Sequence, residues 1–179
     1  MPHYMIDLET LDTASTAVIT SIGIVEFDTN GLIGEVEYHL DIAQQLKVGR
    51  TVSADTLMWW FNQDNDARAI LRQGQIKTKY MPDSLRSISH FIKDKEEDRA
   101  IVWGNGASFD NVKLASLYES FNMKEPWAYY NDRCYRTLKS SHKNVSYKRD
   151  GVHHRAVDDA RTQALHLIKI NKAAGGVYL

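Results

Sequence analysis

Two carboxylates stand two positions apart in the segment YMIDLET, which is otherwise apolar enough to form the first strand of a core. Side chains i and i+2 of a strand share a face, so Asp7 and Glu9 are expected side by side, with Ile6 and Leu8 on the opposite face. Neighbouring carboxylates repel each other, and burial adds to the cost of ionising both. A divalent cation such as Mg²⁺ or Mn²⁺ would remove both penalties. The alternative is an exposed edge strand whose acids face water.

A third carboxylate, Asp110, follows the apolar segment RAIVWGNG at the start of an amphipathic stretch. Functional sites of α/β sheets form at the carboxyl ends of strands, so Asp110 is a candidate to join the first pair. An acid in a first helical turn also offsets the helix dipole, and this explanation stays open for Asp110 alone. The Gly-Asn-Gly here is no dinucleotide fingerprint, because Phe109 occupies the place of the third glycine.

A histidine and a fourth acid stand five positions apart in HHRAVDDARTQAL. On a continuous helix His154 and Asp159 would be separated by about 140°, at ~100° per residue. They converge if His154 lies on the preceding loop and Asp159 in the first helical turns. A neutral imidazole beside a metal site can take a proton from water near pH 7. A loop histidine can equally be a surface residue.

The first elements that must position these groups are three strands, in HYMIDLET, AVITSIGIVEFD and GEVEYHLDI, where Ile42 continues the alternation of the third. Short connections between them predict an antiparallel start. Ser53 is expected to cap a helix over Ala54–Gln63, followed by a short helix over Asp66–Arg72. A further helix is expected after Pro82, through DSLRSISHFIKDKEE.

The second half alternates strands and helices. A buried strand in RAIVWGNG precedes a helix in SFDNVKLASLYESF, and a short strand and a turn of helix are expected near Asp132–Lys139. The last helix is predicted over Ala156–Ala173, and the residues expected on one side of it are Ala160, Ala164, Leu165 and Ile168. This order predicts an α/β fold with a mixed sheet and helices on both faces.

Composition sets outer bounds on the class of protein. The 179 residues are 43% hydrophobic and 25% charged, which suits one globular domain over residues 1–179. A net charge of −1 argues against tight, sequence-independent coating of a duplex. The single cysteine, Cys134, excludes a disulfide framework and a cysteine-based zinc site. With no membrane-spanning apolar run and no signal-peptide pattern, we expect no membrane association and a cytoplasmic location.

Three of these segments, taken in order, resemble the motifs of a known family. IDLET in the first strand, NGASFD opening a central helix and HRAVDD opening the last helix are similar to the three exonuclease motifs of the DEDDh family. That family comprises the DnaQ-like 3′→5′ exonucleases with an RNase H-like fold, in which three antiparallel strands lead into parallel ones. The resemblance spans Asp7 to Asp159. It implies four acids that bind two Mg²⁺ or Mn²⁺ ions and one general base: Asp7, Glu9, Asp110, Asp159 and His154.

The chemistry implied by the resemblance is two-metal hydrolysis of phosphodiester bonds at the 3′ end of single-stranded nucleic acid, releasing nucleoside monophosphates. Asp7 would bridge both ions, Glu9 and Asp159 would hold the ion that binds the nucleophile, and Asp110 would support the second. Asp158 competes with Asp159, and the spacing of five between histidine and acid in the family selects Asp159.

Two further segments, TLMWWFNQDNDAR and NDRCYRT, are similar to stretches of phage-encoded DEDDh enzymes of the exonuclease A type. This narrower resemblance favours DNA over RNA and, for a phage protein, the host cytoplasm. The alternatives are an exoribonuclease on the same site and a catalytically inactive module that binds nucleic-acid ends. A third is a structural role in which the acids are surface charges. A homodimer is also possible.

Contacts to the strand end are expected near the acids and on the aromatic helix. Trp59, Trp60 and Phe61 are about 100° apart on that helix and cannot all face the core. An exposed one near the site could stack on a base, for about 1–3 kcal/mol, unless all three line core and interface. The basic loop Lys143–Arg149 is expected to guide single strands. The other candidate substrate contacts are Thr10, Asn105, Phe109 and Arg136.

Overall fold

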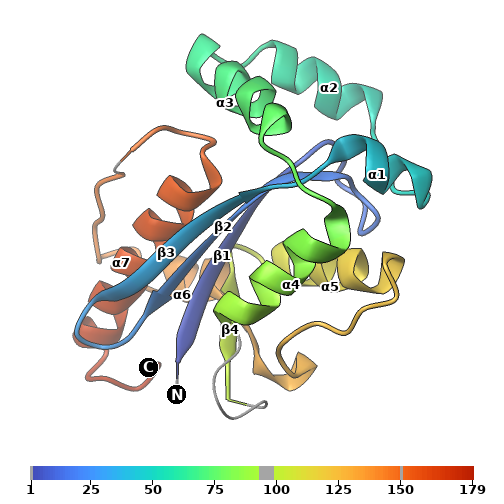
Figure 1. Ribbon diagram of the computed structural model, residues 1–179. Helices are drawn as coiled ribbons and strands as arrows, with labels where there is room; N and C mark the ends of the chain where they lie inside the picture. Colours follow the sequence, from blue (N-terminus) through green and yellow to red (C-terminus); the bar gives the residue numbers. More distant parts are fainter. Residues whose placement is uncertain (1, 93–98, 150) are drawn as a thin grey trace.

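The protein forms a five-stranded sheet with helices on both faces, in a computed structural model that describes residues 2–92, 99–149 and 151–179 (Figure 1). The strand order is β3-β2-β1-β4-β5. The strands are β1 (His3–Thr10), β2 (Ile19–Phe27), β3 (Leu32–His39), β4 (Ile101–Gly104) and β5 (Asp132–Cys134).

Strand β1 lies at the centre of the sheet. It pairs antiparallel with β2, where Ile6 opposes Ile24, and parallel with β4, where Ile6 opposes Gly104. Strands β2 and β3 are antiparallel, whereas β4 and β5 are parallel. The prediction of three leading antiparallel strands followed by parallel strands is therefore confirmed.

The helices fill the connections and the end of the chain. They are α1 (Ile42–Lys47), α2 (Ala54–Phe61), α3 (Asn65–Ile76), α4 (Met81–Ile92), α5 (Asp110–Ser120), α6 (Tyr135–Ser141) and α7 (Ala156–Ala173), with a short 3₁₀ turn, η1 (Tyr129–Asn131), before β5. The predicted cap of α2 is confirmed, because Oγ of Ser53 accepts a 3.1 Å hydrogen bond from the backbone N–H of Thr56. Within the described residues, no helix is both long and apolar enough to cross a bilayer.

Several boundaries differ from the prediction. The third strand ends at His39, and Ile42 begins α1, because Asp41 caps that helix by accepting a 2.7 Å hydrogen bond from the N–H of Gln44. Helix α2 ends at Phe61, and α3 extends four residues beyond the predicted end, to Ile76. The part of the predicted fourth helix at 93–97 lies outside the described residues.

Helix α7 has the predicted bounds, but its buried side differs in part. Leu165 is 39% exposed and Ile168 is only partly buried, so Leu165 does not share the buried side of Ala160 and Ala164, as the prediction placed it. Leu167 and Ile170 take that place beside Ala160 and Ala164: these four are buried in the core cluster between α7 and the sheet.

The two faces of the sheet carry separate cores. Helices α4 and α5 cover one face, and α6 and α7 cover the other (Figure 1). Ile6 and Leu8 belong to the core on the α4–α5 side, whereas Met5 belongs to the core on the α7 side. Because side chains alternate along β1, Asp7 and Glu9 share the α7 face with Met5. Figure 1 also shows α2 and α3 beyond the carboxyl end of β1.

Candidate active site

Three carboxylates from two distant segments meet at the carboxyl end of β1. Asp7 and Glu9 each offer a carboxylate oxygen, and Asp159 of α7 offers a third, and these atoms all lie within 4.8 Å of one another. Glu9 and Asp159 are buried. The structure thus brings together acids that are 150 positions apart in the sequence.

The start of α7 reaches the sheet because Gly23 of β2 has no side chain. A Cβ atom at this position would lie 2.2 Å from the backbone carbonyl carbon of Ala156, the first residue of α7. The loop before α7 is then fixed to the helix by the backbone N–H of His154, which donates a 3.1 Å hydrogen bond to Oδ2 of Asp159. The close packing of α7 on β2 therefore positions Asp159, and the bond from the His154 backbone N–H positions His154.

Asp110 completes the acidic cluster from the first residue of α5. Burial raises the pKa of Asp110 to about 7, although the backbone N–H groups of Asn105 and Leu8 donate hydrogen bonds to it. Its negative charge also contributes to raising the pKa of Asp7. Asp110 lies outside the group of three oxygens within 4.8 Å but shares their electrostatic environment.

Burial and mutual repulsion both raise the pKa values of these acids. Burial raises the pKa of Asp7 well above its usual range, and Asp110 and Asp159 raise it further. Burial is also the main cause that raises the pKa of Glu9, and repulsion from Asp7 and Asp159 raises it further. Arg149 offsets part of the charge, because its Nη2 lies 3.6 Å from Oδ1 of Asp159. Four crowded carboxylates with this surplus of negative charge fit hard divalent cations, which prefer oxygen ligands.

Asp158 and Asp159 have separate environments although they are neighbours. Oδ2 of Asp158 accepts a 2.9 Å hydrogen bond from the backbone N–H of Val152, and Oδ1 accepts a 2.8 Å bond from Arg161. Asp158 therefore holds the loop and the helix together, whereas Asp159 faces Asp7 and Glu9.

His154 lies beside the acids on the loop before α7. Its Nδ1 is 3.8 Å from Oε1 of Glu9, and its backbone has a φ of 63°, in the left-handed region. Burial lowers the pKa of His154, which favours the neutral imidazole near pH 7. The rings of His154 and Trp59 meet edge to face, with centroids 4.9 Å apart.

The aromatic helix places its three side chains differently. Trp59 is 43% exposed and lines an open cavity of 440 Å³ together with Glu9, Thr10 and Phe109. Trp60 is only 4% exposed, and its Nε1–H donates a 2.9 Å hydrogen bond to the backbone carbonyl of Thr10.

Trp60 thus supports the end of β1 through its bond to Thr10. Because its ring is buried, it is not available to stack on a base, and the prediction that Trp60 contacts the substrate is corrected. Phe61 is 62% exposed and is not among the residues that line the cavity.

Asn105 and Arg136 lie on the Asp110 side of the site. Arg136 is exposed and donates a hydrogen bond to the backbone carbonyl of Asn105. Its positive charge also lowers the pKa of Asp110. From the basic loop, Arg149 reaches the acids, whereas Lys139, just before that loop, donates to the hydroxyl of Tyr147.

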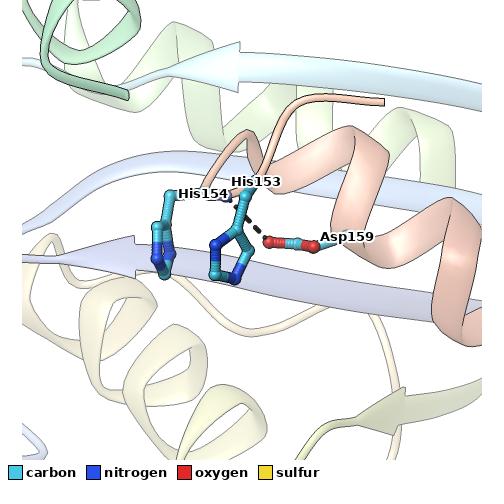
Figure 2. A group of neighbouring side chains, drawn as sticks. All are labelled: His153, His154 and Asp159. Carbon is cyan, nitrogen blue, oxygen red and sulfur yellow. Dashed lines mark hydrogen bonds between the residues drawn. The ribbon is translucent and has the colours of Figure 1, made fainter. Parts of the chain in front are cut away.

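Two residues beside the acids were not predicted from the sequence, and one of them is bonded to Asp7. Nε2 of Gln163 donates a 2.7 Å hydrogen bond to Oδ1 of Asp7. A signal existed, because Gln163 follows Asp159 by four positions and so lies on the same helix face. His153 is the second: it offers a ligand atom within 4.8 Å of those of His154 and Asp159 (Figure 2). The His-His pair in the sequence was its signal.

Comparison with solved structures places this geometry in a known fold. The nuclease domain of 3′hExo, a DEDDh family member bound to rAMP, is 12% identical with a TM-score of 0.66, over 99% of this chain and 94% of that one. Exonuclease X in complex with 5′ overhanging duplex DNA is 16% identical with a TM-score of 0.60, over 97% and 93%. At these identities the likeness shows the fold, which is that of the RNase H-like DEDDh exonucleases.

A third structure, E. coli Exonuclease I in complex with a 5cy-dT13 oligonucleotide, is 10% identical with a TM-score of 0.69, over 97% of this chain and 41% of that one. The comparisons do not support the narrower likeness to phage enzymes, and no curated protein matches the chain.

The family model of the 3′-5′ exoribonuclease Rv2179c-like domain matches residues 2–171. The match covers nearly the whole chain, including both ends of the acidic cluster. The chain therefore belongs to the 3′-5′ exoribonuclease Rv2179c-like domain family and is a 3′-5′ exonuclease with the fold of the DEDDh enzymes.

Proposed function

We propose that residues 1–179 act as one catalytic domain that removes nucleoside monophosphates from the 3′ end of single-stranded nucleic acid. The observation that supports this proposal is the meeting of buried acids from β1, α5 and α7 beside one imidazole. The groups assigned to the site are Asp7, Glu9, Asp110 and Asp159 as ligands of two divalent ions, Mg²⁺ or Mn²⁺, and His154 as the base.

The cation fit is supported by the donor set, because the acids are all oxygen ligands and repel one another strongly when ionised. When bound, such ions neutralise negative charge that develops on the phosphate and make water a stronger nucleophile. Asp7 and Glu9 are each repelled by both Asp110 and Asp159, so both lie within reach of the ions. The resemblance to the DEDDh motifs assigns the bridging position to Asp7.

His154 takes the proton of the attacking water in this proposal. Its lowered pKa keeps the ring neutral and able to accept a proton near pH 7. The bond from its N–H to Asp159 and the edge-to-face contact with Trp59 restrict where the ring can lie. A restricted base lowers the entropic cost of the proton transfer.

The cavity beside Glu9 and Thr10 is the proposed place for the terminal nucleoside. Trp59 and Phe109 both line it, so an unpaired base can stack on an aromatic ring there. Stacking accepts any base, which suits an enzyme that removes nucleotides one after another. The bond from Trp60 to the carbonyl of Thr10 keeps the floor of the cavity in place.

We propose RNA as the preferred substrate, because the family that matches the chain is described as exoribonucleolytic. DNA is the second candidate. It was favoured by the segments similar to phage enzymes, and the solved structures with this fold include complexes with single-stranded and duplex DNA. A contact to the 2′-hydroxyl group decides between the two sugars.

The test is digestion of matched, 5′-labelled RNA and DNA oligomers with Mg²⁺ or Mn²⁺. The proposal expects a ladder shortening from the 3′ end, release of nucleoside monophosphates and faster loss of RNA. Asp7→Asn should remove the activity, whereas Asp83→Asn, at an exposed ion pair on α4, should not. Faster cleavage of DNA would overturn the RNA assignment alone.

A second measurement separates catalysis from end binding. Mn²⁺ should raise the melting temperature of the parent protein, because a ligand that binds the folded state stabilises it, and Asp7→Asn should lose this effect. If neither metal supports digestion of the oligomers while the protein still binds their ends, the enzymatic proposal is contradicted and the inactive module is favoured.

A further inference from the structure

A second group of potential metal ligands adjoins the acidic cluster and differs from it in chemistry. His153, His154 and Asp159 each offer one ligand atom, and these atoms all lie within 4.8 Å of one another (Figure 2). Asp7, Glu9 and Asp159 present oxygen alone, whereas this group presents two imidazoles and one carboxylate. Imidazole nitrogen suits Zn²⁺, Cu²⁺ and Ni²⁺, while oxygen ligands suit Mg²⁺ and Mn²⁺.

The shape of the loop is what places both imidazoles on one side. Consecutive side chains of an extended chain point in opposite directions, but the φ of 63° at His154 turns the chain. The two rings lie with centroids 3.7 Å apart and an angle of 31° between their planes, so the exposed ring of His153 has to turn outward for both imidazoles to face one ion. Figure 2 shows the two rings side by side, both on one side of the carboxylate of Asp159. The hydrogen bond from the His154 N–H to Oδ2 of Asp159 ties the loop to that acid.

An incoming ion has access to the group, and a further ligand is within reach. His153 is exposed and His154 is partly buried, so one imidazole faces solvent. Oε1 of Glu9 lies 3.8 Å from Nδ1 of His154 and can supply a fourth ligand. Two nitrogens with one or two carboxylate oxygens match the ligand types of zinc sites.

We propose that His153, His154 and Asp159 form a binding site for a transition-metal ion of the Zn²⁺ class, and that its occupation inhibits the nuclease. The inhibitory part rests on the proposed function. Asp159 and His154 belong to both sites, so an ion held by them occupies the imidazole lone pair that would accept the proton. It also withdraws a carboxylate from the Mg²⁺ or Mn²⁺ site. His153 belongs to the second group alone and therefore distinguishes the two.

The first experiment measures binding without activity. Metal-free Asp7→Asn protein, in which the oxygen site has lost a ligand, is titrated with Co²⁺ while its visible absorption is recorded, and Zn²⁺ is then added to displace the Co²⁺. We expect a nitrogen-ligated Co²⁺ spectrum, and His153→Ala should weaken Co²⁺ and Zn²⁺ binding by at least about tenfold. The matched control is His90→Ala, at an exposed histidine on α4, which should bind as before.

The second experiment measures inhibition. With saturating Mg²⁺, Zn²⁺ should stop oligomer digestion by the parent protein at concentrations that leave His153→Ala active. His153→Ala should digest like the parent when Zn²⁺ is absent. Circular dichroism confirms the fold, and His153→Asn serves as a second variant if the alanine protein is unfolded.

Unchanged Co²⁺ and Zn²⁺ affinity in the His153 variants would overturn the site, and equal inhibition of variant and parent would overturn its regulatory role. If no oligomer is digested at all, the proposed function fails, while the Co²⁺ titration still decides whether the site exists.

Discussion

The side-chain amide of Gln163 donates a 2.7 Å hydrogen bond to Oδ1 of Asp7 and so joins the last helix to the first strand. Within the described part of the chain, Oε1 of Gln163 is buried without a hydrogen-bond partner. The amide nitrogen of Gln163 is therefore bonded to Asp7, whereas its amide oxygen makes no hydrogen bond among these residues. Since the side chain carries no charge, it orients this carboxylate without neutralising it. Gln163 is a positioning residue in the proposed site.

Gln163→Leu should lower the rate of mononucleotide release by about 10–100-fold, the usual effect of losing a group that orients a metal ligand. The loss should appear in kcat more than in KM, because the substrate cavity is untouched. A Mn²⁺ titration should show weaker activation at the same time. Gln73→Leu, at an exposed position of α3, is the matched control. An unchanged Mn²⁺ response in Gln163→Leu would show that the hydrogen bond has no positioning role.

The neighbouring acids of α7 should separate stability from activity. Asp159→Asn should lower the rate by orders of magnitude while the free energy of unfolding without metal stays level or rises, since a repelling charge is removed. Asp158→Asn should instead cost about 1–3 kcal/mol of stability, because its bonds to Val152 and Arg161 weaken, with activity per folded molecule retained. Urea unfolding and initial rates measure both quantities. The reverse pattern would mean that Asp158 is the metal ligand.

The two tryptophans of α2 should also behave differently. Trp59→Ala should weaken binding of a single-stranded oligomer by about 1–3 kcal/mol with little change in unfolding, because this ring lines the cavity. Trp60→Phe removes the donor to Thr10 and should lower the free energy of unfolding by about 1 kcal/mol. Fluorescence anisotropy of a labelled oligomer and urea unfolding give the two numbers. Equal oligomer affinity in the parent and Trp59→Ala would exclude the stacking role.

The buried acids should lower the stability of the metal-free protein as the pH rises through the acidic and neutral range, whereas the lowered pKa of His154 acts in the opposite direction. The pKa of Asp110 is raised from its ordinary value of 3.8 to about 7 by burial, so the folded state holds this proton more tightly than the unfolded chain. The stabilisation is complete below about pH 4 and is lost as the pH rises towards 7. Asp7 and Glu9, whose pKa values are also raised, act in the same direction.

Urea unfolding at pH 4.5, 5.5 and 7, in buffer that contains a metal chelator, measures how the free energy of unfolding changes with pH. Asp110→Asn should flatten this dependence in part, because its amide does not titrate. An equal pH dependence of the free energy of unfolding in the parent protein and in Asp110→Asn would show that Asp110 does not hold its proton in a buried site.

The local pattern of the sequence determined much of the fold. The alternation of β1 put Asp7 and Glu9 on one face, and Ser53 correctly marked the start of α2. The bounds of α7 also followed from its pattern. These features depend on neighbours a few positions apart, whose relative directions are set by backbone geometry. Asp41 was the exception, because its role as a helix cap was hidden in the alternating pattern of the preceding strand.

Tertiary structure alone decided which distant side chains meet. Gln163 reaches Asp7 and His153 comes close to Asp159 because α7 packs against β2 at Gly23. That Trp59, and neither Trp60 nor Phe61, lines the cavity likewise depends on how α2 rests on the end of β1. Spacing along a chain fixes directions within one element, whereas contacts between elements depend on how their surfaces pack together. The sequence therefore determined the motifs and their order, and the fold decided which partners complete the site.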